Sequence, residues 1–491
     1  MTEAFVQATI NINMFAVCLS LLVLSTPIDN AHDYFTGLSR PYAERIQIKR
    51  NGGPVILIVV DAMRPDHLSP YGYDRDTTPN LKALADDGII LTNYHVNGNW
   101  TRPSTASMLT GLPPSEHGVE RDRDRLADEY VTMAELLRDV KVPTGAVVGN
   151  GNAGSAFGLS RGFDFYADTV KHWRGLPSAD QVVELAIPFV RKHREQPFFL
   201  MLFFIDPHDP YHAPPPYENM YVGKDAAPLI RSPHWERFKY TKAQIERMKA
   251  TYDGALRYAD TAIGRFIATL KELGIYDQAT IMVTADHGEA FGEHGVFLHA
   301  HHLYDEIVRA PLIIRSPIMS TRGVYHNGLF QTIDLMPSIV RYFDGKVPSQ
   351  LPGADIFAHL ARPRLIDAQR FVICEFHNFG IHRRMIRNYE YKIIYEEPAD
   401  AKEFYATVRK RSLLPSVSFD RDKIMFFDLD RDPFEINNIY SSNNAKRQPW
   451  RGLIKLLKTH RARYHRSKAT PMAERLDTNT ENNLRSLGYI Q

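Results

Sequence analysis

Cysteine is nearly absent from this chain of 491 residues, which contains only Cys18 and Cys374. Two cysteines exclude a disulfide framework and a metal cluster held by thiolates. An excess of charge of one sign is also missing, because the net charge is +2, so no nucleic-acid partner is expected. The sequence has no internal repeat and no low-complexity tract. Its composition, 44% hydrophobic and 24% charged residues, is that of an ordinary globular protein.

Charged residues are absent from one stretch near the N-terminus, residues 4–28, and residues 14–24 within it are almost wholly apolar. That length suits the core of a signal peptide or a marginal membrane span. The nearest lysines and arginines follow the stretch, which argues against export of what comes after it. We interpret residues 1–30 as a signal or membrane anchor, and the protein as exported or membrane-associated rather than cytoplasmic. A helix packed on the domain surface is the alternative.

Three apolar runs, at residues 54–61, 198–206 and 280–286, are typical of buried parallel strands. Helical patterns stand between them, including a capped segment at residues 78–88 and a long amphipathic segment at residues 241–273. Strands that alternate with helices predict an α/β domain with a mostly parallel sheet. In such sheets ligands bind beyond the carboxyl ends of the strands.

Acidic and histidine side chains stand where these three strands end. The first strand finishes on Asp61, the second leads into Asp206 and His208, and the third leads into Asp286 and His287. A single aspartate at a strand end is usually a cap or turn residue. Three strands that deliver such groups to one edge would bring carboxylates and an imidazole together, where they repel one another unless a cation holds them. We therefore predict a metal site at this edge.

A threonine precedes a short predicted helix in the stretch GNWTRPSTASMLTG, residues 98–111. Pro103 suits the first helical position and Gly111 suits the position just past the end. Thr101 would then lie at the amino end, where the helix dipole favours anions. It could simply cap the helix. If the metal site lies beside it, a divalent cation could instead activate its hydroxyl as a nucleophile.

Five motifs, in order, resemble those of the sulfatase family within the alkaline phosphatase superfamily. They are VVDAMRPDHLSPYGYDRDTTPNLKALADDG, TRPSTASMLTGLPPSEHGV, DPHDPYHAPP, TADHGEAFGEHGVFLHAHHLYDEIVRAPLIIR and MFFDLDRDPFEINNIY. The resemblance covers nearly the whole chain after residue 51. It implies an alkaline-phosphatase-like α/β/α sandwich at residues 52–360, with a mostly parallel central sheet. A smaller α+β subdomain with an antiparallel sheet would follow at residues 361–491, where two segments, 385–395 and 423–430, have strand patterns.

The sequence departs from the family pattern at four positions. Sulfatases carry a cysteine or serine that is oxidised to formylglycine, followed by Pro-Ser-Arg. Here that slot holds Thr101, which cannot become formylglycine, and Thr105 replaces the arginine. Ala62 replaces a second aspartate, and His287 stands where asparagine is common. The chain thus resembles the threonine-nucleophile branches of the superfamily, and an imidazole in place of a carboxylate favours zinc or manganese over calcium.

Carried over position by position, the resemblance implies two sets of site residues. The metal ligands would be Asp61, Thr101, Asp286 and His287. The residues that contact the substrate or protonate the leaving oxygen would be His208 and His299. Ligands of a second metal could be His212, His301 and His302, although each could equally be an ordinary surface histidine.

The predicted function is that of a metal-dependent hydrolase or transferase that acts on phosphate esters through Thr101. The substrate would be a phosphodiester or phosphoryl headgroup of a small molecule, lipid or glycan. One alternative is a sulfuric ester hydrolase that works without formylglycine. The other is a binding protein that keeps the fold but has lost catalysis.

Overall fold

The computed structural model describes residues 46–47, 52–169, 178–229, 240–362, 370–378, 380–397 and 423–440. It also describes residues 453, 455, 457, 470–471 and 478–486. The apolar segment expected to be a signal or anchor, residues 1–30, lies outside these ranges. Among the helices in the described ranges, none has both the length and the apolar character needed to cross a membrane.

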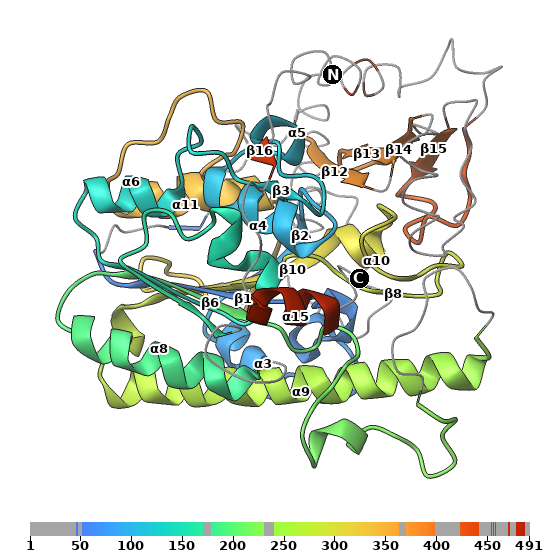
Figure 1. Cartoon of the computed structure of the whole chain (residues 1–491), viewed down its shortest axis with the longest axis horizontal. Coiled ribbons are helices and arrows are strands. Elements are labelled where there is room, and N and C mark those ends of the chain that lie inside the picture. Colours follow the sequence, from blue (N-terminus) through green and yellow to red (C-terminus); the bar gives the residue numbers. More distant parts are fainter. Residues whose placement is uncertain are drawn as a thin grey trace, which may run out of the picture.

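An eight-stranded sheet runs through the centre of the molecule (Figure 1), in the order β11-β2-β10-β7-β1-β6-β4-β5. Its strands are β1 (Val55–Val60), β2 (Ile89–His95), β4 (Thr144–Val148), β5 (Phe165–Asp168), β6 (Phe199–Phe204), β7 (Thr280–Thr284), β10 (Arg309–Arg315) and β11 (Val324–Gln331). Only β10 runs antiparallel to its neighbours. The three strands predicted from the sequence are β1, β6 and β7, and β1 pairs in parallel with both of the others. The prediction of a mostly parallel sheet is confirmed.

Helices cover both faces of this sheet (Figure 1). On one face lie α3 (Pro79–Asp86), α8 (Ala179–His193) and α9 (Lys242–Glu272), and on the other lie α4 (Thr101–Thr110), α6 (Met133–Asp139) and α11 (Leu335–Tyr342). Every residue of β1 and β6 is therefore buried, which explains why these strands are continuous apolar runs rather than alternating ones. The predicted α/β/α sandwich is confirmed.

The two helices predicted between the strands form close to the expected bounds. The first, α3, has Thr78 at its N-cap and Pro79 at its first position, as predicted. The second, α9, begins with a capping box. The Thr241 hydroxyl accepts a hydrogen bond from the Gln244 backbone N–H, and the Gln244 side chain accepts one from the Thr241 N–H.

The C-terminal part of the chain contributes a four-stranded antiparallel sheet, as predicted. Its strands are β12 (Val372–Asn378), β13 (Ile381–Arg387), β14 (Tyr391–Glu396) and β15 (Lys423–Asp428). One face of this sheet joins the main core through Cys374, Met385 and Ile394. The other face forms a separate cluster that includes Ile386 and Leu457. The helices expected of an α+β subdomain fall largely outside the described residues.

Buried ion pairs connect this second sheet to the main domain. Lys392 of β14 is completely buried, and its Nζ lies 2.7 Å from Asp305 Oδ1 and 2.6 Å from Glu435 Oε1. Arg387 of β13 lies 3.1 Å from the other oxygen of Asp305. Asp305 begins α10 (Asp305–Val308), a short helix that leads into β10 of the central sheet. The charges of the two sheets therefore neutralise each other across their contact.

Candidate active site

The carboxyl ends of β1 and β7 bring together three of the predicted metal ligands. Asp61 directly follows β1, and Asp286 and His287 follow β7 after one intervening residue. All three side chains are completely buried. Each offers one ligand atom, and these atoms all lie within 4.8 Å of one another. Since β1 and β7 are neighbours in parallel, their ends place these groups side by side without any specialised loop.

The protonation state of His287 shows that, at its centre, this cluster contains acceptors but no donor. Its Nδ1 lies 2.8 Å from the Gly288 carbonyl oxygen, which can only accept, so Nδ1 carries the hydrogen. The lone pair of Nε2 then faces Asp61 Oδ1 at 3.3 Å and Asp286 Oδ2 at 3.4 Å. Both carboxylate oxygens lack a hydrogen-bond partner. Three buried acceptors thus point at one another, which is unfavourable unless a cation or a proton lies between them.

Burial opposes charge on each member of the cluster. It raises the pKa of Asp286 to about 7 and that of Asp61 well above its usual value, and it lowers the pKa of His287 to about 3. A divalent cation would reverse these shifts, because it is bound by ionised carboxylates and a neutral imidazole. The unpartnered oxygens and the Nε2 lone pair of this cluster therefore fit such an ion.

Thr101 lies beside the cluster, but not as a helix cap. The helix α4 begins at Thr101 itself, with Trp100 in the N-cap position and Pro103 third in the helix. The prediction that Pro103 opens the helix was wrong, because proline is tolerated throughout the first turn, where no N–H is needed. Gly111 does end the helix in the left-handed conformation, with a φ of 68°, as predicted.

The Thr101 hydroxyl points at the candidate metal ligands. Its Oγ1 lies 3.4 Å from His287 Nε2 and accepts a hydrogen bond from Asn150 Nδ2 at 3.2 Å. The capping interpretation is therefore wrong. Thr105, which occupies the arginine position of the family pattern, donates its hydroxyl to the Thr101 carbonyl at 2.7 Å. Thr105 thus supports the first turn of α4.

Asn150 is a site residue that the sequence reasoning missed. Its Nδ2 donates to Asp61 Oδ2 at 2.5 Å as well as to Thr101, so one amide holds both side chains. Its Oδ1 is fixed in turn by the Asn152 backbone N–H at 2.8 Å. Asn150 follows β4, a strand of five residues that pairs in parallel with β6. The available signal was the short apolar run before Gly149, which ends at the same edge as the three predicted strands.

The two predicted substrate histidines form a row with His287. The rings of His287 and His299 are stacked with centroids 4.2 Å apart, and the ring of His208 meets that of His299 edge-on at 4.8 Å. His208 Nδ1 lies 2.8 Å from the Asp209 carbonyl oxygen and therefore donates to it. Both histidines are thus placed within reach of a substrate bound at the cluster.

Glu289 is the second residue that sequence reasoning missed. Its Oε1 lies 3.0 Å from His299 Nδ1, and its side chain is completely buried. Burial raises the pKa of Glu289 to about 8 and lowers that of His299 well below its usual value. Burial therefore disfavours the charged form of both groups, and a single proton lies in the hydrogen bond between them. Its signal was the spacing of Glu289, three residues after Asp286 in the same loop.

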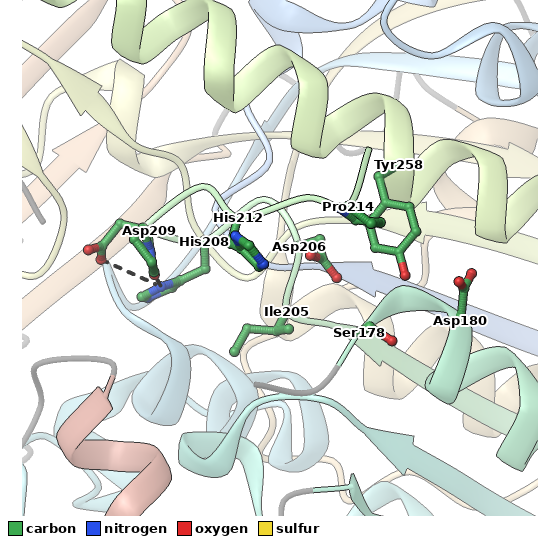
Figure 2. Close-up of a pocket in the computed structure, with 10 residues that line it drawn as sticks. Ser178, Asp180, Ile205, Asp206, His208, Asp209, His212, Pro214 and Tyr258 are labelled. Atoms are coloured by element: carbon green, nitrogen blue, oxygen red, sulfur yellow. Dashed lines mark hydrogen bonds and ion pairs between the residues drawn. The ribbon is translucent and has the colours of Figure 1, made fainter. Parts of the chain in front are cut away.

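The histidines considered for a second metal do not join the cluster. Within the described parts of the chain, the group able to hold a metal consists of the three ligands named above. His301 is buried, and its Nε2 lies 2.6 Å from the Phe297 carbonyl oxygen. His212 is exposed and lines a cavity that His208 also lines (Figure 2). The geometry therefore supports one metal centre in this region.

The loop after β1 is braced by charged side chains. Arg64 is buried and pairs with Asp66 at 2.6 Å and with Glu293 at 2.7 Å. It also donates to the backbone carbonyl of Glu289 at 2.8 Å. His67 Nδ1 lies 2.7 Å from Asp253 of α9. These contacts hold the loop that follows Asp61 against the loop that follows Asp286.

The fold and the grouping of these side chains define a protein of the alkaline-phosphatase-like α/β/α class. Within that class, the sulfatase family model matches residues 54–345, and the model of the C-terminal region of N-sulphoglucosamine sulphohydrolase matches residues 292–462. The chain therefore belongs to the sulfatase family, and it is a hydrolase of that family.

Relatives of this chain include enzymes named for different esters. It is 24% identical to a multifunctional alkaline phosphatase superfamily protein of Trinickia caryophylli, covering 78% of this chain and 90% of the relative. It is also 24% identical to human N-sulphoglucosamine sulphohydrolase, covering 75% and 82%. Among solved structures, the phosphonate monoester hydrolase of Agrobacterium radiobacter superposes with a TM-score of 0.65 at 21% identity, covering 84% of this chain and 96% of that one. That structure shares the fold.

Proposed function

We propose that the protein is a metal-dependent hydrolase or transferase of phosphate esters with Thr101 as its nucleophile. One observation carries this proposal. The Thr101 hydroxyl is directed at the buried acceptors of Asp286 and His287 and is held there by Asn150, instead of capping its helix. A hydroxyl kept in such surroundings has an orientation suited to attack on a bound ester.

Asp61, Asp286 and His287, with the Thr101 hydroxyl, would hold the cation. When bound, the cation would supply charge to neutralise the ester anion and would lower the pKa of the Thr101 hydroxyl. Two carboxylates with an imidazole favour zinc or manganese, with calcium as the less suited ion. Asn150 keeps Oγ1 in place, and the amino end of α4 stabilises negative charge that develops on the ester.

The reaction follows from these positions. Thr101 Oγ1, after its proton has passed to solvent, attacks phosphorus in line as the bond from phosphorus to the alcohol oxygen breaks. His208 or His299 gives a proton to the departing alcohol. Water, or an acceptor alcohol, then returns a proton to that histidine as it attacks the threonyl ester, which releases the phosphoryl group. The Thr101 oxygen takes a proton from solvent and becomes a hydroxyl again. The substrate would be an ester of a small molecule, lipid or glycan.

Hydrolysis of sulfuric esters without formylglycine is the second candidate. It is favoured by the match of residues 292–462 to the C-terminal region of a sulphohydrolase and by the relatives named as sulfatases. Against it, sulfatases work through formylglycine, which Thr101 cannot form, and the arginine of the family motif is replaced by Thr105. A non-catalytic binding protein is disfavoured, because a site without function has no reason to keep buried acceptors without partners.

A substrate panel tests the proposal. A phosphodiester, a phosphate monoester, a phosphonate monoester and a sulfate ester, each of p-nitrophenol, are compared with zinc, manganese and calcium. We expect the highest kcat/KM for a phosphorus ester with zinc or manganese. Faster turnover of the sulfate ester would support the second candidate. A protein that binds metal fully but turns over none of the four esters would refute both enzymatic readings.

A further inference from the structure

A cavity of about 310 Å³ is lined by His208, and none of the candidate metal ligands is among its described lining residues (Figure 2). Its walls come from the loop after β6, from the start of α8 and from Tyr258 of α9. His208 lines the cavity and also meets His299, so one imidazole separates the cavity from the histidine row. A group bound in this cavity would therefore touch the residue proposed to protonate the leaving oxygen.

The charged side chains that line the cavity are carboxylates. They are Asp180, Asp206 and Asp209, and no lysine or arginine is among the described residues of its walls. An ester anion would be repelled here and would stay with the cation. The cavity is therefore suited to the other half of the ester, the alcohol, and its volume is at the lower end of that of small-ligand sites.

Two of these carboxylates already have a basic neighbour. Asp180 pairs with Arg265 of α9, and 43% of its side chain is exposed to solvent. Asp209 Oδ1 lies 3.6 Å from His208 Nδ1. Neither group needs a ligand to account for its position.

Asp206 forms no such pair with any residue in the described part of the chain. It is 8% exposed, its Oδ2 has no hydrogen-bond partner, and its carboxyl accepts from the Ala179 N–H at the start of α8. Figure 2 shows the carboxyl in the cavity wall between His212 and Tyr258. Burial raises the pKa of Asp206 to about 7, as expected for a carboxyl that lacks a counter-charge.

We propose that this cavity holds the alcohol part of the ester and selects one that carries an ammonium group, which pairs with Asp206. The inference rests on the proposed ester-cleaving function. An ammonium group would supply Asp206 Oδ2 with a positive charge and an N–H donor. A charge-assisted hydrogen bond to a buried carboxylate is stronger than one between neutral groups. Amino alcohols and amino sugars are the substrate class that this chemistry fits.

The test compares two esters that differ only in this group. Methyl phosphodiesters of 3-aminopropanol and of 1-butanol have nearly the same shape, but only the first carries an ammonium. We expect the wild-type protein to favour the ammonium ester in kcat/KM, and Asp206→Asn to reduce that preference about tenfold or more. Asparagine keeps an oxygen for the Ala179 N–H while removing the charge. The control is Glu184→Gln. Glu184 is an exposed carboxylate of α8 that does not line the cavity, so this variant should keep the wild-type preference.

A second variant guards against a folding defect in Asp206→Asn. His212 is exposed and lines the cavity, so His212→Lys should fold and place a tethered ammonium near Asp206. It should reduce the preference as Asp206→Asn does. Thermal unfolding of each variant measures its stability.

Calorimetry measures the binding of 3-aminopropanol alone to the metal-loaded protein, which is a readout that does not depend on turnover. We expect saturable binding that weakens about tenfold or more in Asp206→Asn. Cleavage of both esters without a preference, or with a preference that neither variant changes, would overturn the inference and leave the proposed function intact. If neither ester is cleaved, the proposed function fails, and the binding measurement alone decides the inference. Absent binding, or equal binding to both proteins, overturns it.

Discussion

Replacement of Thr101 separates a nucleophile from a structural residue most clearly. Thr101 is completely buried, and its hydroxyl accepts one hydrogen bond from Asn150. Thr101→Ser removes one buried methyl group, a loss of about 1 kcal/mol of stability. Thr101→Ala also removes the hydrogen bond, so the total loss should be about 2 kcal/mol. One Nδ2 hydrogen of Asn150 then loses its acceptor, while the other still donates to Asp61.

The expected effect on turnover is much larger than this effect on stability. Without the nucleophile, Thr101→Ala should lose three or more orders of magnitude in kcat, which corresponds to at least about 4 kcal/mol in the activation barrier. Thr101→Ser should keep part of the activity, since a hydroxyl remains beside the cation. Thr101→Cys should not gain strong sulfatase activity, because Thr105 leaves the oxidation motif incomplete. Steady-state kinetics, thermal unfolding and metal analysis on the same preparations give all three quantities.

A covalent adduct is the decisive observation. Acid quench during turnover of a phosphodiester, followed by peptide mass analysis, should find the phosphoryl group on Thr101. The Thr101→Ala protein, still folded and still able to bind metal, should give no adduct. An unmodified Thr101 in the wild type, together with full activity of Thr101→Ala, would refute the mechanism.

Four further predictions address the metal, the proton donor and the C-terminal sheet. Zinc affinity should fall as the pH drops below about 7, because the metal binds ionised Asp286 and burial raises the pKa of this carboxyl to about 7. Calorimetry at pH 8, 7 and 6 measures this, and a flat profile would contradict it. Asp61→Ala should lose metal and activity together, so full metal occupancy in that variant would refute the ligand assignment. Replacing His208 or His299 with glutamine should slow alkyl esters far more than p-nitrophenyl esters if that residue protonates the leaving oxygen, and equal slowing would assign it a positioning role. A chain that ends at Ala361 should lose solubility or activity, and a soluble, fully active product would show that the second sheet is dispensable.

The central part of the site could be predicted because it follows from the sheet. Continuous apolar runs identify strands buried on both faces, and the residues after parallel strands must meet at one edge. That reasoning predicts that Asp61, Asp286 and His287 lie together. It also placed Thr101 near them, although only through the order of the family motifs.

The remaining features depend on contacts that a linear pattern does not contain. Asn150 follows a strand of only five residues, and its role lies in a single amide that reaches two side chains distant in sequence. Glu289 is identified only by its hydrogen bond to the ring of His299, ten residues later. The first residue of α4 was misplaced because Pro103 is compatible with several positions in a first turn.

The buried ion pairs between the two sheets limit how this protein can be recombined with its relatives. A chimera that takes its C-terminal sheet from another sulfatase would replace Arg387, Lys392 and Glu435 but keep Asp305. If the donor lacks matching basic residues, Asp305 would be left ionised without these two partners, and removal of the partner of a buried charge costs about 3–5 kcal/mol. Exchange of this sheet by natural recombination or by design should therefore succeed only when α10 travels with it.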